Sequence, residues 1–459
     1  MGAGWYDGRH VLVAGAGVSG ATVTRVLLGL GAKVTVVDRS AQPELEALGA
    51  AVLPEGAPLP ADLGQAVVSP GFSPAHPLVL ACLAAGLEVF SEPELAWRLR
   101  PENAAPWLAV TGTNGKTTTV TMLAGMLAAA GLRTVATGNI GYPLLSAVLD
   151  PDPYDVLAVE LSSFQLHWSA TLAPQAGALL NLADDHLEWH GDFAAYAGAK
   201  ANLWRGEATV AVGNLDDERV ATALAAAPGP RIGFRLGVPG PGELGVVEDL
   251  LVDRAFGGDP GEAFELGPAG EVSPPGAHNV ANALAAAALA RSHGVAPEHI
   301  AAAIRGYTPE PHRNARVATI GGVDWVDDSK ATNPHAAAAS LTAYPRIVWI
   351  AGGQLKGVDI ADLVRTVADR LAGAVLVGVD RAEIGEALRR HAPHVPVADV
   401  ASTDDGAMSE VVAAAARLAA PGDTVLLAPA AASKDMFTSY SHRGEAFAAA
   451  VGALARDAR

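Results

Sequence analysis

The sequence predicts an α/β protein of three domains, built on mainly parallel, doubly wound sheets. Short apolar runs that end in turn residues alternate with alanine-rich helical segments along the whole chain, which is the pattern of strands joined by crossover helices. The length of 459 residues exceeds what one hydrophobic core supports. Proline-rich stretches at 101–106 and 308–313 divide the chain, so we expect domains at 1–103, 104–309 and 310–459.

The apolar runs place the individual strands of these sheets. We expect strands at His10–Gly15, Val34–Val37, Thr134–Thr137, Val156–Glu160, Ala178–Leu182, Val323–Val326, Ile347–Ala351, Ala374–Val379 and Thr424–Ala428. Among the segments between them, one helix is expected at Phe193–Trp204 and another is expected to begin near Ala277.

Composition limits the possible partners and compartment. The net charge is −18 and no block of basic residues occurs, so nucleic acid is not an expected partner. Cys82 is the single cysteine, which excludes an internal disulfide and favours a reducing compartment. The chain enters a strand at His10 without a signal peptide, and no apolar stretch approaches the ~20 residues of a membrane span. We therefore expect a cytoplasmic protein with no membrane insertion.

The stretch Gly112–Thr117 is the centre of the predicted function. It joins a strand end to a helix start through a glycine-bearing turn, which directs several backbone N–H groups at one point and suits a phosphate chain. Lys116 would add positive charge at the outer phosphates, and Thr117 a hydroxyl ligand for Mg²⁺. Val110 stands where the standard phosphate loop has a glycine. The alternative is an ordinary turn before a helix, but nucleotide binding is favoured.

A second glycine motif lies near the N-terminus. Gly15-x-Gly17-x-x-Gly20 follows the first strand, and Asp38 ends the next one, as in a dinucleotide-binding fingerprint. Alone it indicates NAD, yet any nucleotide diphosphate meets the same physical requirement, and a purely structural βαβ unit is the alternative. Later in this domain, Ser69 and Gly71 follow a strand and are expected at the carboxyl edge of the sheet.

Polar side chains after the central strands suggest a metal site. Glu160 ends a strand expected beside the phosphate loop, where a carboxylate can hold Mg²⁺. Asp185, His186 and His190 suggest zinc, but they lack a helical His-x-x-x-His pair and cysteine partners, so Mg²⁺ is favoured. Lys200, by itself, is most simply a surface lysine.

Two further pairs leave their interpretation open. Asn279 and Asn282 lie three residues apart near a helix start, where their amides suit either capping or reading a purine edge. Asp328 and Lys330 share one turn, as a surface ion pair or as part of a polar site.

Together, the ordered motifs resemble the Mur ligases, the ATP-dependent amide ligases of peptidoglycan precursor synthesis. The motifs are Gly112–Thr117, Glu160–Gln165, Asn181 with Asp185 and His186, His278–Asn279 with Asn282, His312–Arg313, Asp328–Thr332, and Gly352–Gly353 with Lys356. The resemblance covers nearly the whole chain. Within the family, the stretches Ser162–Gln165 and Asp328–Thr332 and the compact length are most similar to members that add D-glutamate. The Asp-Asn-Pro-Arg motif of diaminopimelate- or lysine-adding members is absent. Folate polyglutamyl ligases share the phosphate loop but lack the N-terminal nucleotide-binding domain.

The resemblance implies a Rossmann-like UDP-binding domain, a central P-loop ATPase-like domain with a mainly parallel sheet, and a C-terminal Rossmann-like domain. It implies joining of D-glutamate to UDP-N-acetylmuramoyl-L-alanine through an acyl phosphate and a tetrahedral intermediate. ATP, two Mg²⁺ ions and CO₂, as a carbamate on Lys200, would take part, and a cytoplasmic monomer is expected. The alternatives are a sibling Mur-type ligase adding another amino acid, and a nucleotide-binding regulator or NAD enzyme.

The resemblance also assigns residues. Catalytic roles fall to Lys116, His186, Lys200 and Lys330. ATP would contact Gly112, Thr113, Asn114, Gly115, Lys116, Thr117, Thr118, Asn279, Asn282, Arg313 and Asp328. The UDP substrate would contact Val18, Ser19, Asp38, Arg39, Ser69, Gly71, Asn139, Ser162, Gln165 and His186. Mg²⁺ would bind Thr117, Glu160, His186 and carbamylated Lys200. D-Glutamate would bind Thr332, Lys356, Ser433 and Tyr440, the last standing where the family often has phenylalanine.

Overall fold

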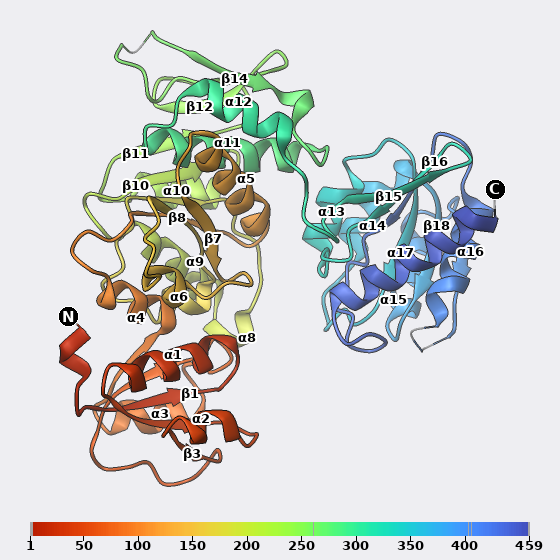
Figure 1. The fold of residues 1–459 in the computed structure, drawn as a ribbon. Coiled ribbons are helices and arrows are strands. Elements are labelled where there is room, and N and C mark those ends of the chain that lie inside the picture. Colours follow the sequence, from red (N-terminus) through yellow and green to blue (C-terminus); the bar gives the residue numbers. More distant parts are fainter. Residues whose placement is uncertain (1–2, 260, 403, 405, 458–459) are drawn as a thin grey trace. The chain divides into compact units, whose positions relative to one another are not determined.

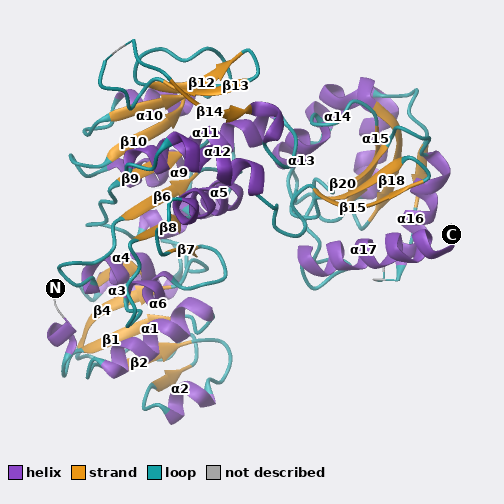
Figure 2. Cartoon of the chain, turned by 45° about the horizontal axis from the view of Figure 1, so that its top comes forward, coloured by secondary structure: helices purple, strands orange, loops and turns teal. Residues whose placement is uncertain are grey.

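A computed structural model describes residues 3–259, 261–402, 404 and 406–457. Its contacts divide the chain into two compact units, Met1–Glu271 with Ala281–Tyr307, and Val272–Val280 with Thr308–Arg459. Within the described residues the strands form three mainly parallel sheets, each flanked by helices (Figures 1 and 2). The predicted mixed α/β fold is confirmed, whereas the division into three domains stays a prediction.

The first sheet is parallel throughout and has the strand order β3-β2-β1-β4-β5. Its strands are β1 (His10–Ala14), β2 (Lys33–Val37), β3 (Ala51–Leu53), β4 (Leu63–Val68) and β5 (Glu88–Ser91), with η1 (Ala3–Tyr6), α1 (Val18–Gly29), α2 (Pro43–Ala47), α3 (Pro77–Ala84) and α4 (Glu92–Leu99). Because β1 lies between β2 and β4, the strand order reverses at β1, and the crevice beside its carboxyl end is where such sheets bind ligands.

The second sheet has the order β14-β13-β12-β11-β10-β9-β6-β8-β7 and is parallel from β7 to β12. Its strands are β6 (Trp107–Thr111), β7 (Thr134–Gly138), β8 (Val156–Glu160), β9 (Ala176–Leu179), β10 (Val210–Asn214), β11 (Arg231–Phe234), β12 (Glu243–Val247), β13 (Leu250–Asp253) and β14 (Phe264–Pro268). Its helices are α5 (Lys116–Ala129), α6 (Leu144–Val148), α7 (Ser163–His167), α8 (Leu187–His190), α9 (Phe193–Ala201), η2 (Asn202–Trp204), α10 (Glu218–Ala225), η3 (Ala269–Glu271), α11 (Ala277–Ser292) and α12 (Pro297–Gly306). The last three strands pair antiparallel.

The second unit holds a sheet of order β15-β16-β20-β17-β18-β19, in which only the β15–β16 pair is antiparallel among the described strands. Its strands are β15 (Ala315–Ile320), β16 (Val323–Asp327), β17 (Ile347–Gly352), β18 (Leu371–Val377), β19 (Val397–Asp399) and β20 (Thr424–Leu427). Its helices are α13 (Pro334–Leu341), α14 (Ala361–Val367), η4 (Ala368–Arg370), α15 (Arg381–His391), α16 (Ala407–Leu418) and α17 (Tyr440–Asp457). Separate apolar clusters cover its two faces, one around Trp349 and the other around Trp325 and Phe447.

The predicted strands are all present, with ends that differ by up to a few residues. The largest differences are three residues, at the start of the strand expected at Ala374–Val379 and at the end of the strand expected at Ala178–Leu182, which the structure ends at Leu179. Beyond it, Asn181 uses its backbone carbonyl and its side chain to bond the Gly112–Thr117 turn, so its backbone is not available to the sheet. The helix expected at Phe193–Trp204 ends at Ala201 and continues as η2.

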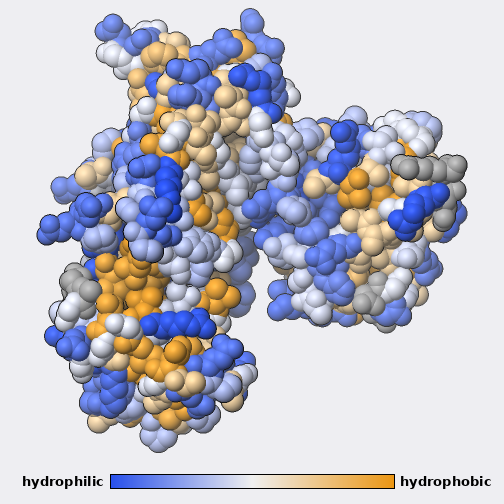
Figure 3. Space-filling model, in the orientation of Figure 1, coloured by the Kyte–Doolittle hydropathy of each residue, from blue (hydrophilic) through white to orange (hydrophobic). Residues whose placement is uncertain are grey.

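The first two sheets share one hydrophobic core. Its buried members include Val13 of β1, Leu95 of α4, Trp107 of β6 and Leu144 of α6. Figure 3 shows apolar residues gathered over α4 and α6 on the face in view. No described helix is both long enough and apolar enough to cross a membrane.

Glu94 of α4 bonds the turn that precedes β9 of the second sheet. Its fully buried carboxylate accepts hydrogen bonds from Arg98 Nε (2.8 Å), from Ala170 N (3.0 Å), and from Thr171 N (3.0 Å) and Oγ1 (2.6 Å). Burial raises the pKa of Glu94, but the Thr171 and Arg98 hydrogen bonds outweigh it and leave the pKa below its usual value. The carboxylate is therefore ionised and fully bonded, which makes it a structural connection between α4 and the turn at 170–171.

We expect Glu94→Gln to lower the free energy of unfolding by about 2 kcal/mol, because an amide nitrogen then faces donors that need an acceptor. Urea unfolding of the whole chain, followed by tryptophan fluorescence, measures the change. Glu218→Gln, at an exposed position of α10, is the control and should change stability by less than about 0.5 kcal/mol. Equal stability of Glu94→Gln and the control would contradict this structural role.

Candidate active site

The Gly112–Thr117 turn lies between the end of β6 and the start of α5. Gly115 precedes α5 with a φ of 84° and no side-chain cap, so the first N–H groups of the helix remain open to an anion. A Cβ at Gly115 would collide with the amide of Asn282, which packs directly against this turn from α11. A glycine is thus required both for the backbone conformation and for the close approach of Asn282.

Lys116 folds back over this turn. Its Nζ donates to the carbonyl oxygens of Gly112 and Thr113, both at 2.9 Å. The turn is braced from the other side by Asn181, whose Oδ1 accepts from Asn114 N at 2.8 Å and whose Nδ2 donates to Asn114 O at 3.1 Å. The Lys116 ammonium group is therefore held in place by two carbonyl oxygens of the turn, and its role in phosphate binding stays a prediction. Thr118, predicted for ATP, lies buried in the first turn of α5.

Three polar side chains meet beside the start of α5. Thr117 Oγ1 donates to Glu160 Oε2 at 2.6 Å, and Asn139 Nδ2 donates to Glu160 Oε1 at 2.8 Å. Glu160 is buried at the end of β8, so the strand fixes its position. A hydroxyl and a carboxylate side by side are hard oxygen donors of the kind that Mg²⁺ accepts.

Thr117 and Glu160 suit Mg²⁺, which needs few protein ligands, better than they suit a metal ion whose ligands all come from the protein. No group of three or more His, Cys, Asp or Glu side chains in the described part of the chain is arranged to hold a metal ion. Mg²⁺ is usually bound by one or two protein ligands together with water and phosphate oxygens, which is what Thr117 and Glu160 provide.

Lys200, in α9, is buried and not on the surface. Its side chain is among the buried polar groups, and Nζ donates to Gly112 O at 2.7 Å, so Lys200 and Lys116 share one carbonyl. Burial lowers the pKa of Lys200 well below its usual value, and the charge of Lys116 lowers it further. The simplest sequence interpretation of Lys200 as a solvated surface residue is wrong, and the site holds an amine that deprotonates readily.

His186 reaches the same region from a short left-handed turn. Its φ is 55°, and its Nε2 lies 3.5 Å from Asp185 Oδ2. Burial lowers the pKa of His186, Asp185 opposes this, and the Lys116 and Lys200 charges lower it further. Its ring packs on Phe164, which also stacks with His190. The imidazole is thus mainly neutral at pH 7 and able to accept a ligand through a ring nitrogen.

Tyr196 lies one turn before Lys200 on α9, and its place in this site was not predicted from the sequence. Its hydroxyl bonds Thr113 Oγ1 at 2.8 Å, and its ring lies 4.8 Å from Lys200 Nζ. Thr113 Oγ1 in turn accepts from Ala183 N at 3.0 Å. The spacing of Tyr196 and Lys200 by four residues places both on one helix face, which is the signal that could have found it.

The N-terminal glycine motif forms a second helix start without a side-chain cap. Gly17 precedes α1 without a side-chain cap, and Val18, the first helical residue, is 71% exposed. Asp38 accepts from Ala16 N (2.7 Å) and Ser40 N (2.9 Å), and the Ser40 and Ala16 hydrogen bonds hold the pKa of Asp38 below its usual value. Asp38 therefore stabilises the loop that precedes α1, through its hydrogen bond to Ala16.

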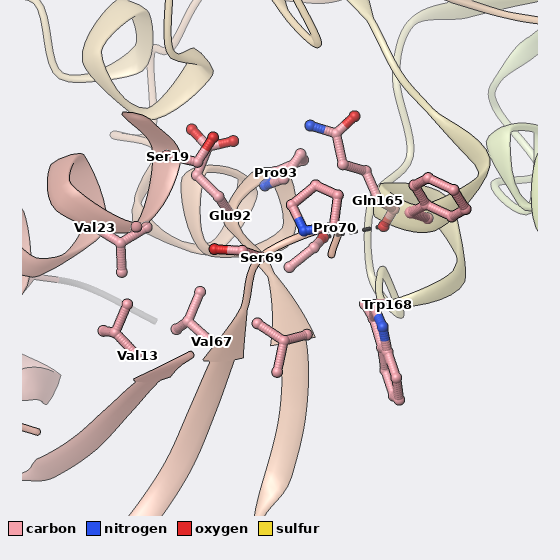
Figure 4. A pocket seen from close by; sticks show the side chains of 14 residues that line it. Val13, Ser19, Val23, Val67, Ser69, Pro70, Glu92, Pro93, Gln165 and Trp168 are labelled. Atoms are coloured by element: carbon pink, nitrogen blue, oxygen red, sulfur yellow. Dashed lines mark hydrogen bonds between the residues drawn. The ribbon is translucent and has the colours of Figure 1, made fainter. Parts of the chain in front are cut away.

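The remaining residues predicted for the UDP substrate divide into two groups. Arg39 pairs with Glu55 at 3.1 Å on the surface, and Gly71 is exposed. Ser19 and Ser69 line a small pocket of about 10 Å³ with Gln165 (Figure 4). Ser162 and Gln165 also form the capping box of α7, with Gln165 Oε1 accepting from Ser162 N at 2.9 Å. Helix capping therefore explains this Ser-x-x-Gln spacing without a ligand.

Asn279 and Asn282 are both buried on α11. The helix begins at Ala277, so both residues lie within it and not at its N-cap, and capping does not explain them. The contact of Asn282 with Gly115 places one amide beside the phosphate turn.

In the second unit, Asp328 and Lys330 do not form the surface ion pair considered from the sequence. Asp328 is buried, accepts from Asn314 N at 3.1 Å and from Ser340 Oγ, and burial raises its pKa to about 6. Lys330 Nζ donates instead to Tyr440 OH at 2.7 Å. Tyr440 thus gives Lys330 a hydrogen-bond acceptor that a phenylalanine at this position would not supply.

The other predicted residues of this unit lie on loops at the carboxyl ends of its strands. Thr332 and Lys356 follow β16 and β17, and Ser433 follows β20. Ser433 is buried and Lys356 is exposed with a φ of 55°. Arg313 lies 3.8 Å from Glu310 and contributes to the electrostatic environment of Asp328.

The comparisons with known proteins agree with this geometry. Residues 110–290 match the model of the Mur ligase middle domain, and residues 312–431 match the Mur ligase, glutamate ligase domain. The chain therefore belongs to the Mur ligase family. Among curated relatives, the UDP-N-acetylmuramoylalanine–D-glutamate ligases of Thermobifida fusca and Streptomyces coelicolor are 59% and 55% identical, each over 98% of this chain and 99% of the relative. The predicted group within the family is thereby confirmed.

Solved structures support the fold alone. MurF from Acinetobacter baumannii aligns over 98% of this chain and 92% of its own with a TM-score of 0.60 and 19% identity. UDP-N-acetylmuramate-alanine ligase MurC from Thermotoga maritima aligns over 97% and 99% with a TM-score of 0.58 and 18% identity.

Proposed function

We propose that the protein is an ATP-dependent ligase that joins D-glutamate to UDP-N-acetylmuramoyl-L-alanine. The observation that carries the proposal is the convergence of Lys116, Lys200 and the Thr117–Glu160 pair on one uncapped helix start. The names of the 59% and 55% identical relatives support the choice of substrates.

The proposed division of labour follows three domains, 1–103, 104–309 and 310–459. The first, Rossmann-like, would bind the UDP part through the start of α1 with Ser19, Asp38, Arg39 and Ser69. The second, P-loop ATPase-like, would bind ATP, and the third, Rossmann-like, would bind D-glutamate. Uncapped helix starts at Val18 and Lys116 support the first two assignments, because each offers backbone N–H groups to a phosphate.

Mg²⁺ would be held by Thr117, Glu160, His186 and the carbamylated side chain of Lys200. When bound, the metal would neutralise charge on the phosphate oxygens of ATP. The depressed pKa of Lys200 supports the carbamate, since CO₂ adds to a neutral amine. A carbamate buried at Lys200, beside Glu160 and Lys116, would be stable only with cations next to it, because an unpaired buried charge is costly.

The chain's own groups then account for the chemistry. Lys116 and the amides of the 112–117 turn would stabilise charge as phosphate is transferred to the alanyl carboxylate, and Asn139 would hold that substrate. In the second unit, Asn279, Arg313 and Asp328 would bind the nucleotide, with Lys330 near its phosphates. Thr332, Lys356, Ser433 and Tyr440 would bind the D-glutamate whose amine attacks the acyl phosphate.

Phosphate release tests this function directly. We expect release from ATP that requires both UDP-N-acetylmuramoyl-L-alanine and D-glutamate, measured with Mg²⁺ across a panel of D- and L-amino acids. Release with a different amino acid would assign a sibling Mur-type activity. Release that ignores the UDP substrate would exclude ligation and favour a nucleotide-binding regulator.

The same preparation tests the proposed monomer. Sedimentation should give the mass of one chain, 46.6 kDa, with and without substrates. Small-molecule substrates and a cytoplasmic location complete the proposal, and neither nucleic acid nor membrane insertion has a part in it.

A further inference from the structure

Glu92 is a buried acid in the pocket beside the start of α1, and it has no part in the function proposed above. It is the first residue of α4 and is 5% exposed. Its Oε1 accepts from Leu145 N at 2.6 Å, and no described residue donates a hydrogen bond to Oε2. One half of the carboxyl group is therefore fixed by α6, and the other half is available to a ligand.

The pocket that contains Glu92 lies at the carboxyl ends of β1 and β4, where the strand order of the first sheet reverses. Ser19 and Gly20, from the start of α1, and Ser69, after β4, form part of its wall. Figure 4 shows Ser19, Ser69 and Glu92 on one side of the pocket and Gln165 and Trp168 on the other. The pocket itself, about 10 Å³, is too small for a diphosphate, but one bound at the start of α1 would lie at its opening, beside Glu92.

No cation accompanies the acid. Among the described residues that line the pocket, Glu92 is the one that carries a titratable group. Burial raises its pKa to about 7, and the Leu145 hydrogen bond lowers it only in part.

The charged groups on the surrounding elements are all engaged elsewhere. His10 of β1 bonds Asp62 and Thr35, and Arg25 of α1 pairs with Glu44. Arg98 of α4 pairs with Glu94 and with Glu88 of β5, and His167 of α7 packs on Trp168. Helix α6 and strand β4 carry no charged side chain. A doubly negative diphosphate beside an ionised Glu92 would thus meet an uncompensated like charge at a pocket lined mainly by apolar residues.

We infer that Glu92 acts as a neutral carboxylic acid that positions the UDP-sugar substrate, donating a hydrogen bond from Oε2 to its diphosphate. The inference rests on the proposed function, because it takes a UDP-linked substrate at the start of α1. Glu92 is then a positioning residue: binding of the anionic substrate takes up a proton at this carboxyl group, and the affinity falls once the pH exceeds the pKa of the acid.

Calorimetry of UDP-N-acetylmuramoyl-L-alanine binding to the full chain, without ATP and from pH 6 to 8.5, tests this. For the wild type we expect the Kd to rise about ten-fold per pH unit above pH ~7, with uptake of about one proton at pH 8 in buffers of different ionisation enthalpy. Glu92→Gln keeps a donor, so its Kd should stay flat and within about two-fold of the wild type at pH 6, without that uptake. Glu92→Leu should bind about ten-fold more weakly than the wild type at pH 6, with a Kd that does not change with pH.

Glu46→Gln, exposed on α2, is the matched control and should behave as the wild type. A wild-type Kd independent of pH, or a Glu92→Gln variant as weak as Glu92→Leu, overturns the inference, the second by showing that Glu92 accepts as an anion. Thermal melts show that each variant is folded. Phosphate release by the same wild-type sample separates the two hypotheses. If the protein ligates but its Kd for the UDP-sugar does not depend on pH, the inference alone is refuted. If the protein does not bind the UDP-sugar, both the proposed function and the inference are refuted.

Discussion

Replacing Lys200 with alanine is expected to lower kcat of ligation about a thousand-fold while leaving the chain folded. A loss of that size is about 4 kcal/mol of transition-state stabilisation, which is the scale of a metal ligand that neutralises phosphate charge. The physical basis is the buried Nζ, bonded to Gly112 O at 2.7 Å and kept from protonation by burial and by the charge of Lys116. An ordinary surface lysine would have none of these features.

Two variants separate an anionic role from a cationic one. Short-chain carboxylic acids such as acetate should partly restore Lys200→Ala, because they supply an anion in the emptied space. Lys200→Arg keeps a positive charge but does not form a carbamate, so it should be as inactive as the alanine variant. Lys33→Ala, exposed at the start of β2, should retain full activity. An active Lys200→Arg would remove the carbamate from the mechanism.

Much of this site was predictable because its chemistry lies in short motifs at strand ends. The Gly112–Thr117 turn, Glu160 and His186 each follow a strand of one parallel sheet, so sequence order alone brings them to the same edge. Lys200 was different, since its burial depends on how α9 packs on the turn. From the residues alone it was indistinguishable from a solvated lysine, and only the family resemblance indicated a role.

Two features, the buried Glu92 and the β12–β13 hairpin, could not be predicted from the sequence, for different physical reasons. Glu92 lies in a Glu-Pro-Glu start of a helix, where an acid is expected from the helix dipole alone, and nothing local shows that the residue is buried. The β12–β13 hairpin turns at Glu248, whose φ is 56°, a position where Asn or Gly is the usual signal. The Gly321–Gly322 turn between β15 and β16 did carry that signal, so this antiparallel pair could have been predicted.

Arg443 provides the second large expected effect, in the second unit. The side chain is buried near the start of α17 and donates to Ser329 Oγ and Ser329 O, both at 2.9 Å, to Ala431 O at 3.2 Å and to Gly352 O at 3.4 Å. These acceptors belong to the three loops that carry Lys330 and Thr332, Lys356, and Ser433. Burial lowers the pKa of Arg443 to about 10, with Asp435 and Asp327 opposing it, so the group remains charged at pH 7.

Arg443→Leu should therefore destabilise the chain by about 3–5 kcal/mol, because it leaves several buried carbonyl oxygens without a donor. At a temperature where the variant is still folded, the KM for D-glutamate should rise at least about ten-fold, while the KM for the UDP substrate stays unchanged, since only the loops of this unit lose their shared anchor. Arg390→Leu, exposed on α15, is the control and should change stability by less than about 0.5 kcal/mol. A folded Arg443→Leu variant with an unchanged KM for D-glutamate would show that the three loops hold their geometry independently, and would remove Arg443 from the residues that position the amino acid.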